Sequence, residues 1–121
     1  MGRVSVERIA QLVRLPVVTR YNVAIDLPLR DEAVSQRSSA GLVEQLESAL
    51  EDLAGGPVER AEVGSMTRRG GKLIRVRIEA LVRASDAAEA MTAVMEGIRE
   101  AISPHERDWN VAAASGAASP A

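Results

Sequence analysis

Basic residues are concentrated between Met66 and Arg83, where six of them accompany a single acid, Glu79. The six are Arg68, Arg69, Lys72, Arg75, Arg77 and Arg83. The rest of the chain holds nine basic and sixteen acidic residues, and the formal net charge of the whole is -2. Arginines suit the binding of carboxylates or phosphates, because each guanidinium group donates paired hydrogen bonds. The asymmetry indicates a binding face, unless it is only the polar side of a sheet.

The glycines inside this stretch raise the question of a phosphate-binding loop. Such a loop needs G-x-x-x-x-G-K followed by Ser or Thr. Here Gly70-Gly71-Lys72 is followed by Leu73, and Met66 stands at the position of the first glycine. The segment also joins two predicted strands, so no helix N-terminus would face a phosphate there. The pattern therefore favours a hairpin turn.

Few residues could support catalysis or metal binding. The chain has no cysteine, and His105 is its single histidine. The acids follow no metal-ligand pattern, so we assign no catalytic, cofactor-binding or metal-binding residue. A general base at His105 is a weaker alternative, and Asp26 is better explained by an ion pair across strands with Arg75 or Arg77. The sequence leans against an enzyme, and no cofactor is implied.

Binding of a nucleic-acid backbone by Arg75 and Arg77 is a further alternative. Sheets that bind single strands stack the bases on aromatic residues. The chain has no Phe, one Tyr and one Trp, and Glu62, Glu79 and Asp26 would interrupt the positive field. A nucleic acid is therefore less favoured as a partner than a protein.

Trp109 is the single tryptophan, and two roles are open for it. It could insert into a partner, since Trp is enriched at interface hot spots, or it could close the core beside the first strand. The second role is favoured because "WNVA" matches a short final strand. The candidate partner- or anion-binding residues are Arg68, Arg69, Lys72, Arg75, Arg77 and Trp109.

Apolar periodicity predicts the elements that position these residues. Alternation predicts strands at 17–29, 58–67 and 73–84, and helical spacing predicts helices at 39–54 and, after a cap at Asp86, up to 102. In the second strand we assign Ala61, Val63 and Ser65 to one face and Arg60, Glu62 and Met66 to the other. In the third we assign Ile74, Val76, Ile78, Ala80 and Val82 to the core and Leu73, Arg75, Arg77, Glu79, Leu81 and Arg83 to the opposite face.

The chain divides into three parts along its length. Residues 1–16 form a predicted short amphipathic helix, residues 17–103 form the core domain, and residues 104–121 form a tail. In the tail we expect a short strand at 109–113 and then a flexible Ala/Ser-rich end. Charges interrupt the N-terminal apolar pattern, so we expect no secretory signal. No apolar run is long enough for a membrane span, and a cytoplasmic location is expected.

The order of elements is β-α-β-β-α with a possible final β, which resembles the split β-α-β arrangement of ferredoxin-like domains. We predict an α+β fold with an antiparallel sheet, two helices on one face and the third strand between the first two. The open side of the sheet would carry Arg20, Asn22, Asp26, Arg60, Glu62, Arg75, Arg77 and Glu79.

An uncovered sheet face suits self-association. We therefore expect a non-catalytic protein–protein interaction or assembly module that acts as a homo-oligomer or as a subunit of a larger complex. Two alternatives stay open: a regulatory domain that binds a small anionic molecule, and a binder of nucleic-acid phosphates.

Overall fold

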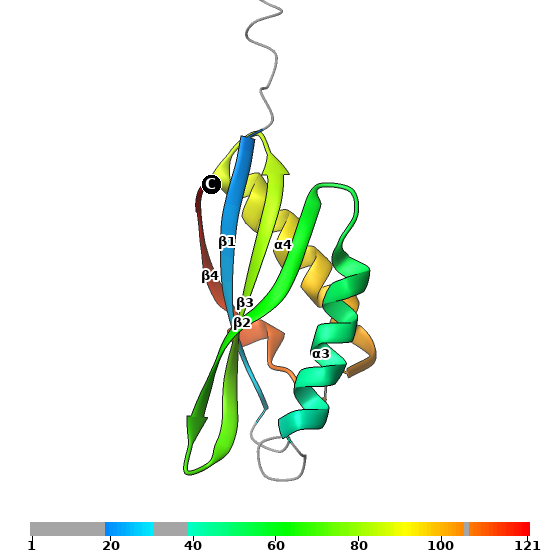
Figure 1. The fold of residues 1–121 in the computed structure, drawn as a ribbon, viewed down its shortest axis with the longest axis vertical. Coiled ribbons are helices and arrows are strands. Elements are labelled where there is room, and N and C mark those ends of the chain that lie inside the picture. The colour runs from blue at the N-terminus through cyan, green and yellow to red at the C-terminus, as the bar shows by residue number, and fades with distance from the viewer. Residues whose placement is uncertain (1–18, 31–38, 106) are drawn as a thin grey trace, which may run out of the picture.

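A computed structural model of the chain describes residues 19–30, 39–105 and 107–121, and within them a four-stranded sheet packs against two helices (Figure 1). The strands are β1 (Thr19–Pro28), β2 (Val58–Arg69), β3 (Lys72–Ala84) and β4 (Ser115–Pro120), and the helices are α3 (Ser39–Leu53) and α4 (Ala87–Ile102). The strand order is β2-β3-β1-β4, and all neighbouring strands are antiparallel. The predicted α+β class is confirmed. The N-terminal helix predicted at 1–16 lies outside the described residues.

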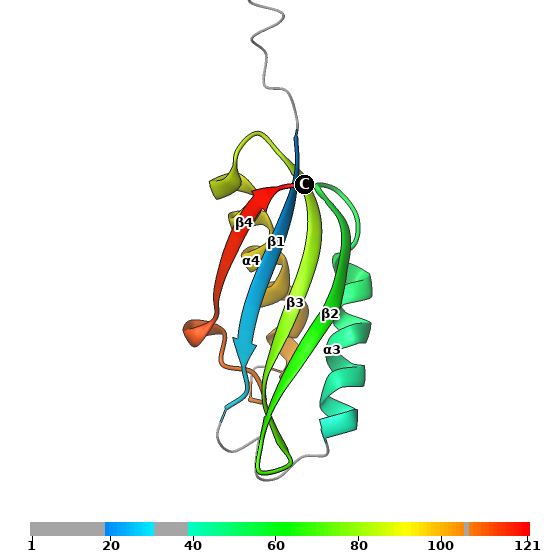
Figure 2. The ribbon, with the colours of Figure 1, turned by 60° about the vertical axis from the view of Figure 1, so that its left-hand side comes forward.

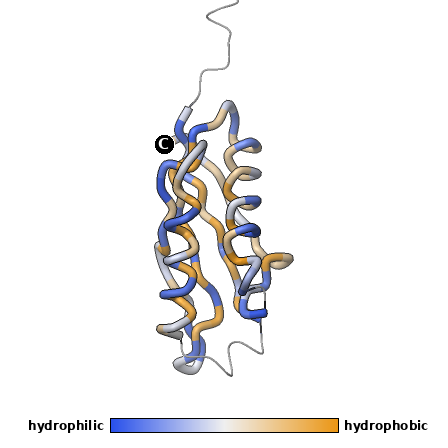
Figure 3. The backbone as a smooth tube through the Cα atoms, turned by 90° about the vertical axis from the view of Figure 1, so that its right-hand side faces the viewer, coloured by the Kyte–Doolittle hydropathy of each residue, from blue (hydrophilic) through white to orange (hydrophobic). Residues whose placement is uncertain are grey.

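Both helices cover the same side of the sheet (Figure 2). The cause is the alternation of apolar and polar residues along the strands, which Figure 3 shows as alternating colours. The inward residues of β1 and β3 are fully buried, among them Val23, Ile25, Leu27, Val76, Ile78 and Val82. Leu42, Leu46 and Leu50 of α3 and Ala90, Val94 and Ile98 of α4 are buried against them. No described element covers the other side of the sheet, which we call the open face.

The helix ends follow the predicted signals. The Asp86 carboxylate accepts a hydrogen bond from the Glu89 backbone N–H at 2.8 Å and so caps α4. The Glu89 carboxylate accepts from Ser85 rather than from the backbone of Asp86. At the other helix, α3 stops just before Gly55 and Gly56, whose φ angles of 141° and 58° end the helical path.

A tight turn joins β2 to β3. Arg69 pairs with Lys72, and Gly70 and Gly71 between them have φ angles of 58° and 77°, as the predicted hairpin turn requires. Pairing between β1 and β3 reaches only to Arg75, so the end of the hairpin extends beyond β1 (Figure 1). We call residues 67–75 the hairpin arm.

Irregular pairing between β2 and β3 corrects two of the predicted faces. Ile74 is left unpaired between Leu73 and Arg75, and this extra residue reverses the alternation. Leu73 is therefore buried and Ile74 is only half-buried, the opposite of the prediction.

A second irregularity lies in β2 at Gly64, which has no partner in β3. Ser65 then pairs with Arg77, whose side chain is exposed, and Met66 pairs with Val76, whose side chain is buried. Ser65 and Met66 have therefore exchanged the predicted faces. Met66 is nevertheless 46% exposed.

The C-terminal prediction was wrong in its position. No strand forms at 109–113: Trp109 makes an isolated bridge with Leu29, and Val111–Ala113 form a short 3-10 helix. The segment that we expected to be flexible forms β4, which pairs with β1 from Asp26–Ser115 to Tyr21–Pro120. The Ala, Ser and Gly residues of β4 carry no strand signal of their own, and backbone pairing with the edge of β1 supplies the stabilisation.

Candidate functional site

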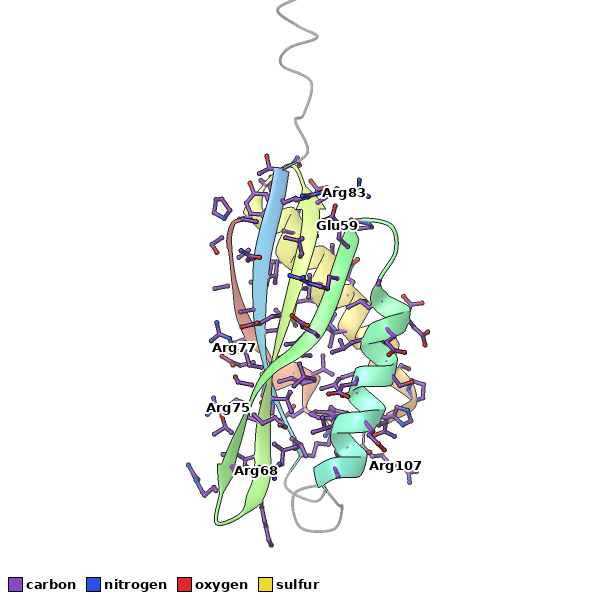
Figure 4. The ribbon with its side chains drawn as sticks, viewed as in Figure 1. Glu59, Arg68, Arg75, Arg77, Arg83 and Arg107 are labelled. Carbon is purple, nitrogen blue, oxygen red and sulfur yellow. The ribbon has the colours of Figure 1, made fainter. Side chains whose placement is uncertain are left out.

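The open face carries cations and anions in nearly equal number. Its charged residues are Arg20, Arg60, Arg75, Arg77 and Arg83 with Asp26, Glu59, Glu62 and Glu79. Figure 4 shows Arg83, Arg77 and Arg75 in succession along the sheet. The face is therefore a mixed surface and not a basic one, although its central strand reads as basic in sequence.

Glu59 is the functional candidate that the sequence did not indicate. Its two carboxylate oxygens lie 3.2 Å from Arg20 Nε and 3.2 Å from Arg83 Nε, so it joins β1 and β3 to β2. The pairing register shifts between Val58 and Arg60, which makes Glu59 an extra residue in β2. Strict alternation would have turned its side chain toward the core, and no signal in the sequence marks the bulge.

Two glutamates face each other in the middle of the open face. Glu62 pairs directly with Glu79, and like charges in this position are unfavourable. Arg77 Nε lies 3.7 Å from a Glu79 carboxylate oxygen and offsets part of this repulsion. Gly64 leaves room for the Glu79 side chain, because a Cβ at Gly64 would lie 2.6 Å from Glu79 Cδ.

The predicted ion pair of Asp26 is not formed in this structure. The register places Asp26 opposite Arg77, as a cross-strand pair requires. Among the described residues, however, the ion pair of Arg77 is with Glu79. Asp26 is half-buried on the open face. The guanidinium group of Arg77 beside it is turned along β3 toward Glu79.

A shallow hollow of about 430 Å³ lies in the open face. Its lining comes from all four strands, with Arg60, Glu62, Arg77 and Glu79 on β2 and β3 and with Asn22, Ala24, Ala117 and Ser119 on β1 and β4. The residues from β1 and β4 are short, which is why the face is depressed there. The sequence could not predict this hollow, because half of its small residues belong to the strand that was taken for a flexible tail.

The structure separates the predicted binding residues into groups. Arg75 and Arg77 lie on the open face, and Arg69 and Lys72 continue the same side to the end of the hairpin arm. Arg68 pairs with Leu73, whose side chain is buried, so Arg68 lies on the helix side of the arm. The stretch that reads as one basic ribbon therefore has two sides.

Trp109 is in the core, with 0% of its surface exposed. A fully buried indole cannot insert into a partner, so the alternative of an interface anchor is wrong for this structure, and the core-closing role is the one observed. Its indole Nε1 has no hydrogen-bond partner among the described residues.

His105 lies in the short 3-10 helix Ser103–His105 after α4, away from the residues that line the hollow. Its Nδ1 accepts a hydrogen bond from Gln45 Nε2 at 2.6 Å, which ties this helix to α3. Among the described residues, no group of three His, Cys, Asp or Glu side chains could hold a metal ion. None of the described helices is both long and apolar enough to cross a bilayer.

Comparison with known proteins identifies the fold. No protein-family model matches the chain, and no curated protein matches it. A solved structure from Bacteroides fragilis NCTC 9343, a dimeric protein of unknown function and ferredoxin-like fold, matches with a TM-score of 0.53 and 11% identity. The match covers 84% of this chain and 96% of that one. The protein therefore has a ferredoxin-like fold.

Two further matches are structures of AtUAH, one in complex with glyoxylate and one with (S)-hydroxyglycine. Each has a TM-score of 0.43 and 11% identity, and each covers 93% of this chain and 32% of that one.

Proposed function

We propose that this protein is a non-catalytic assembly module that forms a homodimer through the open face of its sheet. The observation that carries the proposal is the division of this face into two halves of opposite shape. Around the hollow, the outward side chains of β2 and β3 are long and charged, whereas those of β1 and β4 are short. Two copies placed face to face can set the long half of each on the short half of the other.

A two-fold axis that lies between the two sheets achieves this, if it runs parallel to the strands and over the line where β1 and β3 meet. The axis places β3 of one copy over β1 of the second, and packed sheets are separated by about 10 Å. Because Arg77 and Asp26 occupy the same row of the sheet, Arg77 then faces Asp26 of the second copy. An isologous interface repeats every contact, so the ion pair forms twice.

The charge of the face supports pairing with itself. Apart from Arg69 and Lys72 at the end of the hairpin arm, the face carries five arginines and four acids, which nearly cancel, so that two identical copies do not repel each other strongly. The Bacteroides fragilis protein of similar fold is described as dimeric, which agrees in kind with the proposal. At 11% identity, that likeness indicates no residue contacts for this chain.

The test exchanges the charges of the Asp26–Arg77 pair. Asp26→Arg and Arg77→Asp should each lower the association constant of the dimer by roughly tenfold or more, because each variant places like charges opposite each other in the interface. The double variant Asp26→Arg/Arg77→Asp should recover dimerisation, since the pair is restored in reverse. Sedimentation equilibrium measures the constants, and Arg75→Glu/Arg77→Glu should weaken association as well.

Arg99→Asp is the matched control, because Arg99 is an exposed residue of α4, in the layer opposite the open face. It should leave the dimer unchanged. A wild-type protein that sediments as a monomer at every concentration, or a double variant as weak as the single ones, would contradict the proposal.

A second candidate function is the binding of a small anionic molecule in the hollow. A volume of about 430 Å³ suits a small ligand, and Arg60 and Arg77 on its rim could bind a carboxylate or phosphate. Glu62 and Glu79 on the same rim weaken this alternative. Thermal-shift measurements with anionic metabolites decide it, since a ligand of the folded state must raise the melting temperature.

A further inference from the structure

We propose that the cationic end of the hairpin arm docks on an acidic stripe of α3 in another copy of this chain. The contact joins the end of the hairpin to the helix layer, and it is tested at Arg69 and Lys72, which the face-to-face dimer does not use. It would link copies, or dimers of copies, into larger assemblies.

The open side of the arm presents three cations. Arg69 and Lys72 pair across the turn, Arg75 follows on the same side, and all three are exposed. The chain has no acid from Thr67 to Ile78. Within the described ranges no ion pair reaches Arg69, Lys72 or Arg75. These charges therefore repel one another and favour an anionic surface.

The helix α3 provides such a surface. Its acids Glu44, Glu47, Glu51 and Asp52 are all exposed, and the helix contains no Lys or Arg. Positions three and four residues apart lie on one side of a helix, so Glu44, Glu47 and Glu51 form a continuous row. We call these four residues the acidic stripe. None of them takes part in an ion pair within the part of the chain that the structure describes.

This arrangement is unfavourable for an isolated helix. Like charges four residues apart destabilise a helix, and Glu47 and Glu51 are such a pair. The last turn carries Glu51 and Asp52 and no basic residue, although the C-terminus of a helix has a partial negative charge that favours cations. A cationic partner on the stripe would remove both costs, whereas α4 has Arg99 in its last turn and needs none.

The arm of the same molecule cannot be this partner. Arg69, Lys72 and Arg75 lie on the open side of the sheet, whereas α3 covers the opposite side (Figure 1). The two surfaces do match in length. Glu44 to Glu51 spans about 10 Å at the helical rise, and Lys72 to Arg75 also spans about 10 Å along a strand.

Because the arm and the stripe are different surfaces, the contact is heterologous and repeats from copy to copy. It depends on exposed charges, so salt must weaken it. The wild-type protein should therefore form species larger than the dimer at about 0.01 M salt and lose them at about 1 M, where the Debye length falls from about 30 Å to about 3 Å.

Charge reversal tests both surfaces by sedimentation velocity at low salt. The arm variant Arg69→Glu/Lys72→Glu and the helix variant Glu47→Lys/Glu51→Lys should each lose the larger species. An equimolar mixture of the two should recover them, because each reversed surface then meets its opposite. A mere loss of folding could not give that recovery. The control Glu96→Lys/Glu100→Lys has the same spacing on the exposed side of α4 and should retain the larger species.

Three outcomes would overturn the proposal: no salt-dependent association of the wild type, no recovery in the mixture, or equal loss in the α4 control. Binding of the wild type to a single-stranded RNA of mixed sequence, without self-association, would assign the arm to a polyanion instead. The Asp26 and Arg77 variants leave the arm and the acidic stripe intact. A failure of the face-to-face dimer can therefore be distinguished from a failure of the contact between arm and stripe.

Discussion

At the scale of single residues, side-chain contacts here depend on small departures from regular strands. Glu59 reaches Arg20 and Arg83 only because β2 holds an extra residue at that point. Pairs between exposed charges contribute little each, about 0.2–1 kcal/mol. The side chain of Glu59 is only 22% exposed and serves two arginines, so it is the ion-pair residue whose loss should matter most to the sheet.

Trp109 is the residue whose truncation should cost most. It is the largest fully buried side chain and lies between Leu29 and the end of α4. Trp109→Ala should lower the free energy of unfolding by about 3–5 kcal/mol, because it leaves a large cavity. Trp109→Phe should cost less, since the indole Nε1 donates no hydrogen bond to the described residues.

Urea unfolding followed by circular dichroism measures these changes. Met66→Ala is the control, because Met66 is 46% exposed, and it should change the free energy by no more than about 0.5 kcal/mol. A Trp109→Ala variant as stable as the wild type would contradict the core-closing role.

At the scale of elements, β4 shows that a strand can depend on its neighbour and not on its own residues. Its sequence is SGAASP, which lacks the β-branched and aromatic residues that favour strands. What it does have is a close fit to β1: a Cβ on Gly116 would lie 2.5 Å from the Ala24 carbonyl oxygen. Glycine at this position therefore allows the edge strand to pair.

Gly116→Ala should detach β4 from the sheet. The added methyl group meets both the Ile25 side-chain methyl group and the Ala24 carbonyl oxygen. The backbone carbonyl cannot turn aside as a side chain can, so we expect a loss of about 1–3 kcal/mol in the free energy of unfolding. Hydrogen exchange measured by mass spectrometry should show faster exchange in residues 115–121 and little change in β3.

The control is Ala117→Ser, which alters a neighbouring residue on the open face without adding a group toward β1. It should exchange as the wild type does. Unchanged protection of β4 in Gly116→Ala would show that the strand tolerates the methyl group and that the fit of Gly116 is not what positions it.

At the scale of the whole molecule, the uncovered sheet face and the protruding arm are the surfaces on which the proposed assembly depends. The core of this domain lies between one side of the sheet and two helices. Everything proposed about function concerns the surfaces outside that core, namely the open face, the arm and the outer side of α3.

The proposed dimer through the open face predicts that thermal stability depends on protein concentration. Association stabilises the folded state by mass action, so the melting temperature of the wild type should rise with concentration. The Arg77→Asp variant should show a flatter dependence, and the double variant Asp26→Arg/Arg77→Asp should regain it. Differential scanning calorimetry at protein concentrations that span roughly a hundredfold range measures this dependence. A melting temperature independent of concentration in the wild type would count against the dimer.

Local signals in the sequence are sufficient to predict several elements of this fold. Helix α3 ends at its glycines, α4 begins at the Asp86 cap, and the alternation in β1 and most of β3 placed the core and the open face correctly. These features depend on backbone conformation, capping and the burial of apolar side chains, which neighbouring residues decide among themselves.

Features that depend on pairing between distant strands could not be predicted from local signals and are known from the fold alone. The bulges place Glu59 on the open face and exchange the faces that Ser65 and Met66 occupy. Such changes escape a single strand's sequence because register is a property of two paired strands. The edge of β1 made a strand of an Ala/Ser tail, and that strand completed the hollow. The cationic stretch likewise became two surfaces, since pairing with β2 sets which side of the arm each arginine occupies.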